Sequence, residues 1–255
     1  MKTVIKAEIV AHSRNQQGDE LISVLATFPR IILAEVNTHR MLSKNTSSSR
    51  AIPFNKMVDT IKEDPFIPIA WQKAHSGMQG TEYVENKDMI KWNIEMWETA
   101  RDNAIKFATE LTECDVTKQL CNRLLEPFMW TTMLITGPKS GWENFFNLRC
   151  PSYELGIKDQ SIYFKSKKDY QEFLKLNGFD YQISDENWKF LNQGQAEIHM
   201  MALAECIWDA YNESTPKQLK AGEWHIPFVD KMDFMRLGEA SAEYYTNGGK
   251  LLTPS

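Results

Sequence analysis

The chain has 255 residues, of which 42% are hydrophobic and 25% charged, and its formal net charge is −5. This composition is typical of a globular protein with a substantial core and disfavours disorder, and the acidic balance disfavours general nucleic-acid binding. No apolar run is long enough to cross a bilayer. Residues 1–6 turn polar too soon for a signal peptide, so we expect a cytoplasmic protein without a membrane segment.

Hydropathy periodicity predicts the elements in chain order. Residues 4–10 and 21–27 are predicted as a strand pair joined by a polar turn at 15–19, and residues 29–42 as a helix. A short helix at 54–61 precedes a loop at 64–78 that contains proline and glycine. Helical spacing returns over 86–111, with charged residues marking a solvated face.

The second half of the chain continues this alternation. Asp115 is the predicted N-cap of a helix over 116–125 that Pro127 ends, and 128–135 is a predicted strand. Helices are predicted at 140–149 and 194–211, and the second is apolar on nearly every side and therefore buried. The segment at about 150–192 between them is predicted to be an inserted hairpin or small lobe.

These elements predict one α+β domain over residues 1–255, with antiparallel strands packed against long helices and no internal repeat. The four cysteines contain no Cys-x-x-Cys pair, and the five histidines show no His-x-x-x-His or His-Glu-x-x-His spacing. We therefore expect reduced thiols, mostly buried, and no metal site.

Residues 38–50 form a basic, hydroxyl-rich cluster, Thr-His-Arg-Met-Leu-Ser-Lys-Asn-Thr-Ser-Ser-Ser-Arg. Such stretches commonly form turns, because Ser, Thr and Asn side chains satisfy free backbone groups. That explanation leaves the charge unexplained, since Arg40, Lys44 and Arg50 have no acid among these positions to compensate them. Arginine and hydroxyl groups suit phosphate oxygens, so the cluster is a candidate anion site at the end of the preceding helix.

This cluster resembles the signature of flavin-dependent thymidylate synthases, also called thymidylate synthase complementing proteins. The signature is Arg-His-Arg, two residues, Ser, one residue, Asn, two residues, Ser, one residue, Arg. It is matched in register by His39, Arg40, Ser43, Asn45, Ser48 and Arg50.

Two further segments resemble the same family in its chain order. One runs from Arg123 to Pro127, and the other consists of Asn144 to Arg149 together with Gln195 to Ile198. The family keeps the two parts of the last segment close together, whereas the insertion separates them here. The resemblance covers residues 28 to about 211 and indicates a divergent member of the family with an insertion.

The resemblance implies a homotetramer with FAD at subunit interfaces, dUMP beside the flavin, methylenetetrahydrofolate as carbon donor and NADPH as reductant. It implies cofactor contacts for His39, Arg40, Asn45 and Asn144. It implies substrate contacts for Glu35, Ser48, Ser49, Arg50, Arg123 and Arg149, of which Ser48 and Arg149 are also catalytic. Ser48 is assigned to substrate positioning first and covalent attack second, because the cluster offers only His39 as its base.

Three departures from the family pattern leave the substrate open. Thr38 replaces an arginine, Glu35 stands where the family usually has Gln, and Ala51 replaces a common Tyr. A glutamate accepts hydrogen bonds from a ring N–H or an exocyclic amine, so methylation or hydroxymethylation of another pyrimidine nucleotide such as dCMP is an alternative to dUMP methylation. An equal alternative makes Glu35 a surface residue paired with Arg40 or Lys44.

Two alternatives of other classes also stand. The first is a catalytically inactive nucleotide-binding protein on the same scaffold, which Thr38, Glu35 and the long insertion favour. The second is single-stranded nucleic-acid binding by the basic cluster and the eight tryptophans. It ranks last, because an aromatic core is the simpler account of scattered tryptophans.

Overall fold

The computed structural model describes residues 2–75, 80, 82–157, 160–179, 188–194 and 196–229. In this part of the chain the centre is a five-stranded sheet in the order β3-β4-β2-β1-β7. The strands are β1 Lys6–Arg14, β2 Glu20–Pro29, β3 Ser43–Thr46, β4 Trp130–Pro138 and β7 Lys217–Gln218. Neighbouring strands are antiparallel except β1 and β7, which run parallel.

The hairpin of β1 and β2 confirms the predicted strand pair, although both strands are longer than predicted. Gly18 in the connecting turn has a φ of +94°, a conformation that glycine adopts without steric cost. Alternate residues of β2, among them Ile22, Val24 and Phe28, are fully buried. Because side chains alternate between the two faces of a strand, this period of two builds one wall of the core.

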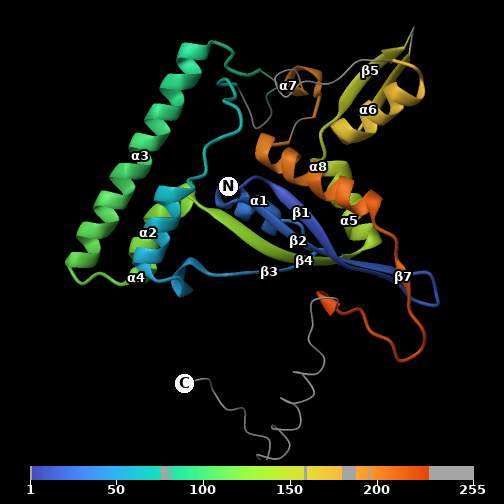
Figure 1. The fold of residues 1–255 in the computed structure, drawn as a ribbon, viewed down its shortest axis with the longest axis horizontal. Coiled ribbons are helices and arrows are strands. Elements are labelled where there is room, and N and C mark those ends of the chain that lie inside the picture. Colours follow the sequence, from blue (N-terminus) through green and yellow to red (C-terminus); the bar gives the residue numbers. More distant parts are fainter. Residues whose placement is uncertain are drawn as a thin grey trace, which may run out of the picture.

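Two helices cover one face of the sheet, α5 Lys139–Arg149 and α8 Ile198–Glu213 (Figure 1). The core beneath them joins alternate residues of β2 to three aromatic side chains of α5 and to the apolar face of α8: Trp142, Phe145, Phe146, Met200, Leu203, Ala204 and Ile207. The Trp142 indole N–H donates to the carbonyl of Ile22 at 3.3 Å, which ties α5 to β2. The buried helix predicted at 194–211 is confirmed, although it starts at Ile198.

A second group of helices stands beside the sheet, on the left of Figure 1. It comprises α2 Phe54–Glu63, α3 Lys87–Glu113, α4 Lys118–Cys121 and the 3₁₀ helix η3 Asn122–Phe128, which pack around an apolar cluster of their own. The helix predicted at 86–111 is confirmed as α3, whose first turn is capped by the Asn86 side chain accepting from Met89 N at 2.9 Å.

The prediction of one helix over 116–125 is wrong. Asp115 has a φ of +61° and belongs to the turn after α3, while Thr117 caps the short α4. The chain then continues as η3, which contains Pro127 rather than ending before it. Proline fixes φ near the value that a 3₁₀ helix also uses, so the tighter helix accepts it.

The helix predicted over 29–42 is much shorter in the structure. A 3₁₀ turn, η1 Arg30–Ile32, leads into α1 Leu33–Asn37, and the helix ends there. The Lys44 ammonium donates to the carbonyls of Val36 at 3.2 Å, Asn37 at 3.4 Å and His39, so it caps the C-terminus of α1. A cation is favourable at that end of a helix. Lys44, which belongs to the predicted anion cluster, is therefore already bound to backbone carbonyls of the protein.

The segment at about 150–192 contains the predicted hairpin. Strands β5 Tyr153–Ile157 and β6 Gln160–Phe164 are followed by α6 Lys167–Leu176 and α7 Trp188–Leu191, at the upper right of Figure 1. A small apolar cluster of Tyr153, Tyr170 and Leu174 holds these elements together. The described residues of this segment therefore form a small lobe beside α8.

The four cysteines are free, with Cys114 exposed, Cys121 buried and the other two between these extremes. Burial raises the pKa of Cys206 to about 11 and also raises the pKa of Cys150. Among the described residues no group of His, Cys, Asp and Glu is arranged to hold a metal ion. Within the same residues, every helix is too short or too polar to cross a membrane.

Candidate functional site

Four of the residues predicted from the sequence, Glu35, His39, Arg123 and Arg149, belong to two clusters beside α1. We call the first the histidine–arginine cluster and define it as Glu35, His39, Arg149, Glu197 and His199. It joins the end of α1 to the C-terminus of α5 and the N-terminus of α8. Three segments that resemble the family signature, far apart in the chain, therefore meet at one place.

His39 and Arg149 form the centre of this cluster. The Arg149 Nε–H donates to His39 Nε2 at 3.0 Å, so that ring nitrogen carries no proton and His39 is the neutral Nδ1–H tautomer. The imidazole is buried and packs edge-on against the Phe145 ring, with 4.8 Å between ring centroids. Burial, helped by the charges of Arg149 and Lys44, lowers the pKa of His39 to about 4.

Glu35 lies beside the same guanidinium, with its Oε2 at 3.9 Å from Arg149 Nη1. This pairing corrects the expectation that Glu35 pairs with Arg40 or Lys44. Burial and the nearby carboxylate of Glu197 raise the pKa of Glu35, and Arg149 partly opposes them. The cluster therefore places the guanidinium of Arg149, whose Nη2 has no hydrogen bond with the described residues, next to the carboxyl group of Glu35. This carboxyl group takes up a proton more readily than an ordinary glutamate.

Glu197 and His199 complete the cluster at the start of α8. Glu197 caps the helix, its Oε2 accepting from His199 N at 2.8 Å and Met200 N at 2.9 Å. His199 Nε2 accepts from Ile69 N at 3.1 Å, so its Nδ1 carries the proton and donates to Glu197 Oε1 at 2.5 Å. Glu197 belongs to the segment that resembled the family, but no role was predicted for it, and Gln195 of that segment lies outside the described residues.

The depressed pKa of His39 predicts a pH-dependent stability. Between about pH 4 and 6.5 the unfolded imidazole binds a proton while native His39 does not, so the free energy of unfolding rises with pH over this window and falls as pH drops. A His39→Gln variant keeps an acceptor for Arg149 but does not titrate. Urea unfolding between pH 4 and 7.5 should show a flatter profile for the variant than for the wild type.

Other groups contribute to the slope in both proteins. His12 and His225 have pKa values lowered mainly by burial, so they act in the same direction as His39. Burial raises the pKa values of Glu35, Glu205 and Asp209, so these carboxyl groups act in the opposite direction. Identical profiles for the wild type and His39→Gln would contradict a buried neutral His39.

The second cluster is a hollow of 490 Å³ between α1 and η3, which we call the arginine pocket. Its lining includes Arg30, Asn37, Arg123 and Glu126. Arg30 donates from Nη2 to Glu126 Oε1 at 3.2 Å, but its buried Nε has no partner among the described residues. An unpaired buried donor is costly unless a ligand supplies an acceptor. Arg123 was predicted from the sequence, and Arg30 was not.

The 3₁₀ helix η2 Ser49–Ala51 is hydrogen-bonded to Glu126, which lines the arginine pocket. The Ser49 hydroxyl is buried and donates to Glu126 Oε1 at 2.5 Å. Asn122, fully buried in η3, donates from Nδ2 to the carbonyls of Ser49 at 2.8 Å and Ile52 at 3.0 Å. These bonds hold the loop that carries Ser48 and Arg50, whose side chains are exposed.

The structure thus brings Glu35, His39 and Arg149 together and places Ser48, Ser49 and Arg50 elsewhere. The two groups are separated by β3, which spans about 10 Å at the usual rise of a strand. Ser48 accepts at 3.3 Å from both the backbone N and Nε of Arg50. In one chain, Ser48 therefore has Arg50 rather than His39 as its partner.

The predicted cofactor residues other than His39 lie on the surface. Arg40, Asn45 and Asn144 are exposed, and their side chains make no hydrogen bond with the described residues. Their chemistry fits FAD, because a guanidinium suits a diphosphate and amides suit the carbonyl and N–H edge of a flavin. His39, the remaining predicted cofactor residue, is buried and accepts a hydrogen bond from Arg149.

The fold is α+β, a mainly antiparallel sheet with one face covered by α5 and α8, and comparison with solved structures agrees with this class. The chain is similar to the UMP/dUMP methylase PolB from Streptomyces cacaoi bound with 5-Br dUMP, with a TM-score of 0.54 and 10% identity, covering 83% of this chain and 92% of that chain. The same methylase bound with 5-Br UMP gives a TM-score of 0.55 and 13% identity, covering 83% and 90%. No protein-family model and no curated protein matches the sequence. At these identities the likeness establishes the fold.

Proposed function

We propose that this protein is a flavin-dependent methylase that transfers a one-carbon unit to C5 of a pyrimidine nucleotide, with dUMP as its first candidate substrate. The observation that carries the proposal is the contact between Arg149 and His39. It joins the basic cluster to the Asn144–Arg149 segment, beside Glu35. Fold likeness to a UMP/dUMP methylase supports the same substrate class.

Each residue of the cluster has a role that follows from its chemistry. Uracil C5 is a weak nucleophile, so a bound pyrimidine needs its carbonyl oxygens polarised as charge develops on the ring. Arg149 supplies N–H donors for a carbonyl, and neutral His39 holds the guanidinium in place without adding a positive charge. Glu35 accepts from the ring N3–H of uracil when it is ionised.

The arginine pocket is the proposed phosphate site. Arg30 and Arg123 place two guanidinium groups at a hollow next to α1, and Arg50 lies in the loop fastened to that hollow through Ser49 and Glu126. Guanidinium groups bind phosphate oxygens in a fixed fork geometry. A nucleotide would therefore place its phosphate at this pocket.

FAD would be held by Arg40, Asn45 and Asn144 at the exposed surface, together with a second copy of the chain. When bound and reduced it supplies a hydride, with methylenetetrahydrofolate as the proposed carbon donor and NADPH as the proposed reductant. The chain's own residues then orient the nucleotide and stabilise charge on its ring.

The test combines binding with turnover. The purified protein is incubated with FAD, desalted, and its visible spectrum recorded with and without dUMP. Turnover is then measured as release of tritium from [5-³H]dUMP in the presence of methylenetetrahydrofolate and NADPH, and product formation from UMP and dCMP is compared under the same conditions. A retained flavin band that dUMP perturbs, followed by tritium release, supports the proposal. A protein that binds neither flavin nor any of the three nucleotides overturns it.

A catalytically inactive nucleotide-binding protein remains the second candidate. The Thr38 hydroxyl donates to the carbonyl of Glu35 at 2.6 Å and Ser49 to Glu126, so two hydroxyls of the signature segment are already engaged within the chain. Nucleotide binding without tritium release would favour this candidate.

The proposed role of Glu35 predicts how the turnover of dUMP depends on pH. Because its pKa is raised, Glu35 takes up a proton above the usual range of a glutamate, and a protonated carboxyl no longer accepts from the N3–H of uracil. We expect kcat/KM for dUMP to fall as pH drops through this raised pKa. Glu35→Gln keeps an acceptor that does not titrate, so its profile should stay flatter on the acid side, and equal acid limbs in the two proteins would rule out this role.

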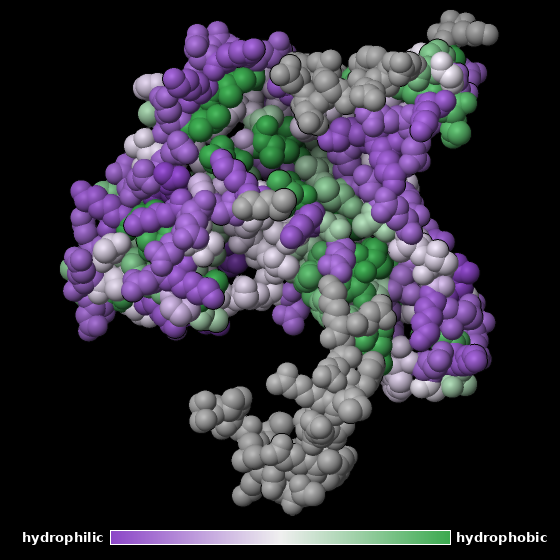
Figure 2. Space-filling view, in the orientation of Figure 1, coloured by the Kyte–Doolittle hydropathy of each residue, from purple (hydrophilic) through white to green (hydrophobic). Residues whose placement is uncertain are grey.

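The surface of α3 supports a multimer. Five exposed apolar side chains lie on one face of this helix within about 100° of arc at 100° per residue, namely Met89, Trp92, Met96, Phe107 and Leu111. Figure 2 shows hydrophobic side chains among the hydrophilic ones over this region. An apolar stripe of this kind marks a contact with another protein surface, and we propose a second copy of this chain as the partner within the homotetramer.

Replacing Trp92 and Met96 together with glutamate should disperse the assembly. Two charges in an apolar contact are not compensated there, so light scattering should show the mass falling toward the 29.5 kDa of one chain. Lys91→Glu, on a neighbouring exposed position of α3, is the matched charge control and should leave the mass unchanged. A wild-type protein that is already monomeric, or a double variant with an unchanged multimeric mass, would contradict the proposed contact.

A further inference from the structure

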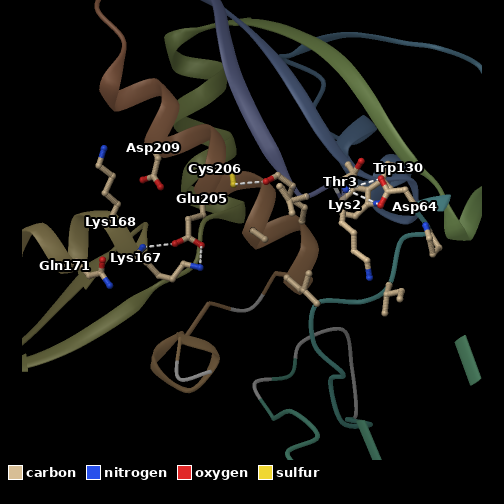
Figure 3. A pocket seen from close by; sticks show the side chains of 16 residues that line it. Lys2, Thr3, Asp64, Trp130, Lys167, Lys168, Gln171, Glu205, Cys206 and Asp209 are labelled. Carbon is tan, nitrogen blue, oxygen red and sulfur yellow. Dashed lines mark hydrogen bonds and ion pairs between the residues drawn. The ribbon is translucent and has the colours of Figure 1, made fainter. Parts of the chain in front are cut away.

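A second hollow, of 570 Å³, lies between the N-terminal residues 2–5, the loop 64–69, α6 and α8 (Figure 3). One face of α8 forms its wall, with Ala202, Glu205, Cys206 and Asp209 at spacings that place them on one side of a helix. Residues Lys167, Lys168 and Gln171 of α6 line the hollow beside Glu205 and Asp209, and Lys2, Thr3 and Asp64 lie on the other side (Figure 3). None of the residues assigned above to nucleotide or flavin lines this hollow in the described part of the chain.

Most charged groups of the hollow are satisfied within the protein. Asp64 accepts from Thr3 N with both carboxylate oxygens, at 3.1 and 3.0 Å. Buried Glu205 accepts from Lys167 N at 2.7 Å and from the Tyr153 hydroxyl at 3.3 Å, and the Lys167 ammonium lies 3.8 Å from its Oε2. These groups shape the walls and are not available to a ligand without breaking internal bonds.

Two charged groups of the hollow, one acidic and one basic, still have an atom without a partner among the described residues. Asp209 uses a side-chain hydrogen bond with Ser166, but its buried Oδ1 has no partner among the described residues. The Lys2 ammonium likewise has no hydrogen bond or ion pair within the described chain, whereas Lys168 pairs with Glu213. Figure 3 shows Asp209 and Lys2 on opposite sides of the hollow.

The surroundings of Asp209 favour an incoming N–H donor. Burial raises its pKa, and the negative charges of Asp169 and Glu213 act in the same direction, against Ser166 and Lys168. A buried carboxyl oxygen without a donor costs free energy that a ligand amine would recover. The lining of the hollow also has a large apolar part, which includes Ile5, Ile69 and Ala202.

We propose that this hollow is a second ligand site, which binds a small zwitterion with an amine at one end, an apolar or aromatic body and a carboxylate at the other end. The amine donates to Asp209 Oδ1, the body lies against Ile5, Ile69 and Ala202, and the carboxylate pairs with Lys2. The long, flexible stem of Lys2 lets one site accept bodies of somewhat different length. The inserted lobe thereby gains a function, because its helix α6 closes one side of the site.

The test uses three probes that differ only at their ends. These are 4-(aminomethyl)benzoate, which carries both charges, benzylamine, which lacks the carboxylate, and 4-methylbenzoate, which lacks the amine. Binding is titrated by saturation-transfer NMR with protein that contains no flavin or nucleotide, so the outcome does not depend on the proposed methylase activity. We expect the zwitterion to bind about tenfold more tightly than either analogue, as charge-assisted hydrogen bonds predict.

Two variants assign the ends of the ligand. Asp209→Asn should weaken benzylamine and the zwitterion about tenfold and leave 4-methylbenzoate unchanged. Lys2→Met, at an exposed position, should weaken binding of 4-methylbenzoate and the zwitterion about tenfold and leave benzylamine unchanged. Melting temperature and far-UV circular dichroism check that both variants are folded. Equal affinities for the three probes, no binding of the zwitterion, or loss in the variants that does not follow the missing end would each overturn the proposal.

Discussion

Replacing Arg149 with alanine should reduce turnover of dUMP by about three orders of magnitude while leaving the protein folded. Groups that stabilise developing charge in an enzyme site are worth about 10²- to 10³-fold each, and Arg149 also orients Glu35 and His39. The measurement is tritium release from [5-³H]dUMP under saturating folate and NADPH, with circular dichroism to confirm the fold. Full activity in the variant would remove Arg149 from the mechanism.

Arg149→Lys is the matched control for charge. Lysine keeps the positive charge but lacks the guanidinium, which binds His39 through Nε and would bind a carbonyl through its other nitrogens. The activity of Arg149→Lys should therefore lie between those of the wild type and the alanine variant. A second readout is independent of activity. Because the charge of Arg149 lowers the pKa of His39, removing it should raise that pKa in an NMR titration of the imidazole.

Asn122→Ala should destabilise the protein by about 1–2 kcal/mol. Asn122 is fully buried, and its Nδ2 donates to the carbonyls of Ser49 and Ile52. Alanine leaves the Ile52 carbonyl without this donor, at a cost of about 1–3 kcal/mol, whereas the Ser49 carbonyl still accepts from Ile52 N. Part of the loss is offset, because the substitution also removes the buried Asn122 Oδ1, which has no partner among the described residues. Urea unfolding at constant pH measures the change.

The same substitution should also affect the nucleotide. Asn122 holds the η2 loop that carries Ser48 and Arg50, so we expect the KM for dUMP to rise in Asn122→Ala more than kcat falls. Asn55→Ala, at an exposed position of α2, is the control and should change the free energy of unfolding by less than about 0.5 kcal/mol. A stability loss without any change in KM would separate the loop from substrate binding.

Much of the fold could be predicted because its longest elements have strong periodicity. β2 is rich in apolar and β-branched residues, α3 has a helical period, and Asn86 stands at the position of its N-cap. β3 could not be predicted from Ser43-Lys44-Asn45-Thr46, because these residues have no apolar alternation and form a strand only by pairing with β4. The end of α1 depends in the same way on Lys44, which reaches back from β3 to cap it.

The candidate site was predictable only in part. His39 and Arg149 carry a recognisable pattern, and the structure places them in contact. Arg30 carries no pattern, because its significance comes from a buried Nε beside η3, which only the folded chain reveals. Glu197 could have been found as the acidic residue immediately before an apolar helix, which is the position of an N-cap.

The distribution of thiols allows the proposed multimer to be tested by spin labelling. Only thiolates react readily with maleimides, and burial covers Cys121 and raises the pKa values of Cys150 and Cys206, which leaves Cys114 exposed just after α3. A nitroxide attached to the unmodified protein would therefore sit at one defined place in each copy. Dipolar spectroscopy would then report how far apart the ends of neighbouring α3 helices lie, without any engineered cysteine.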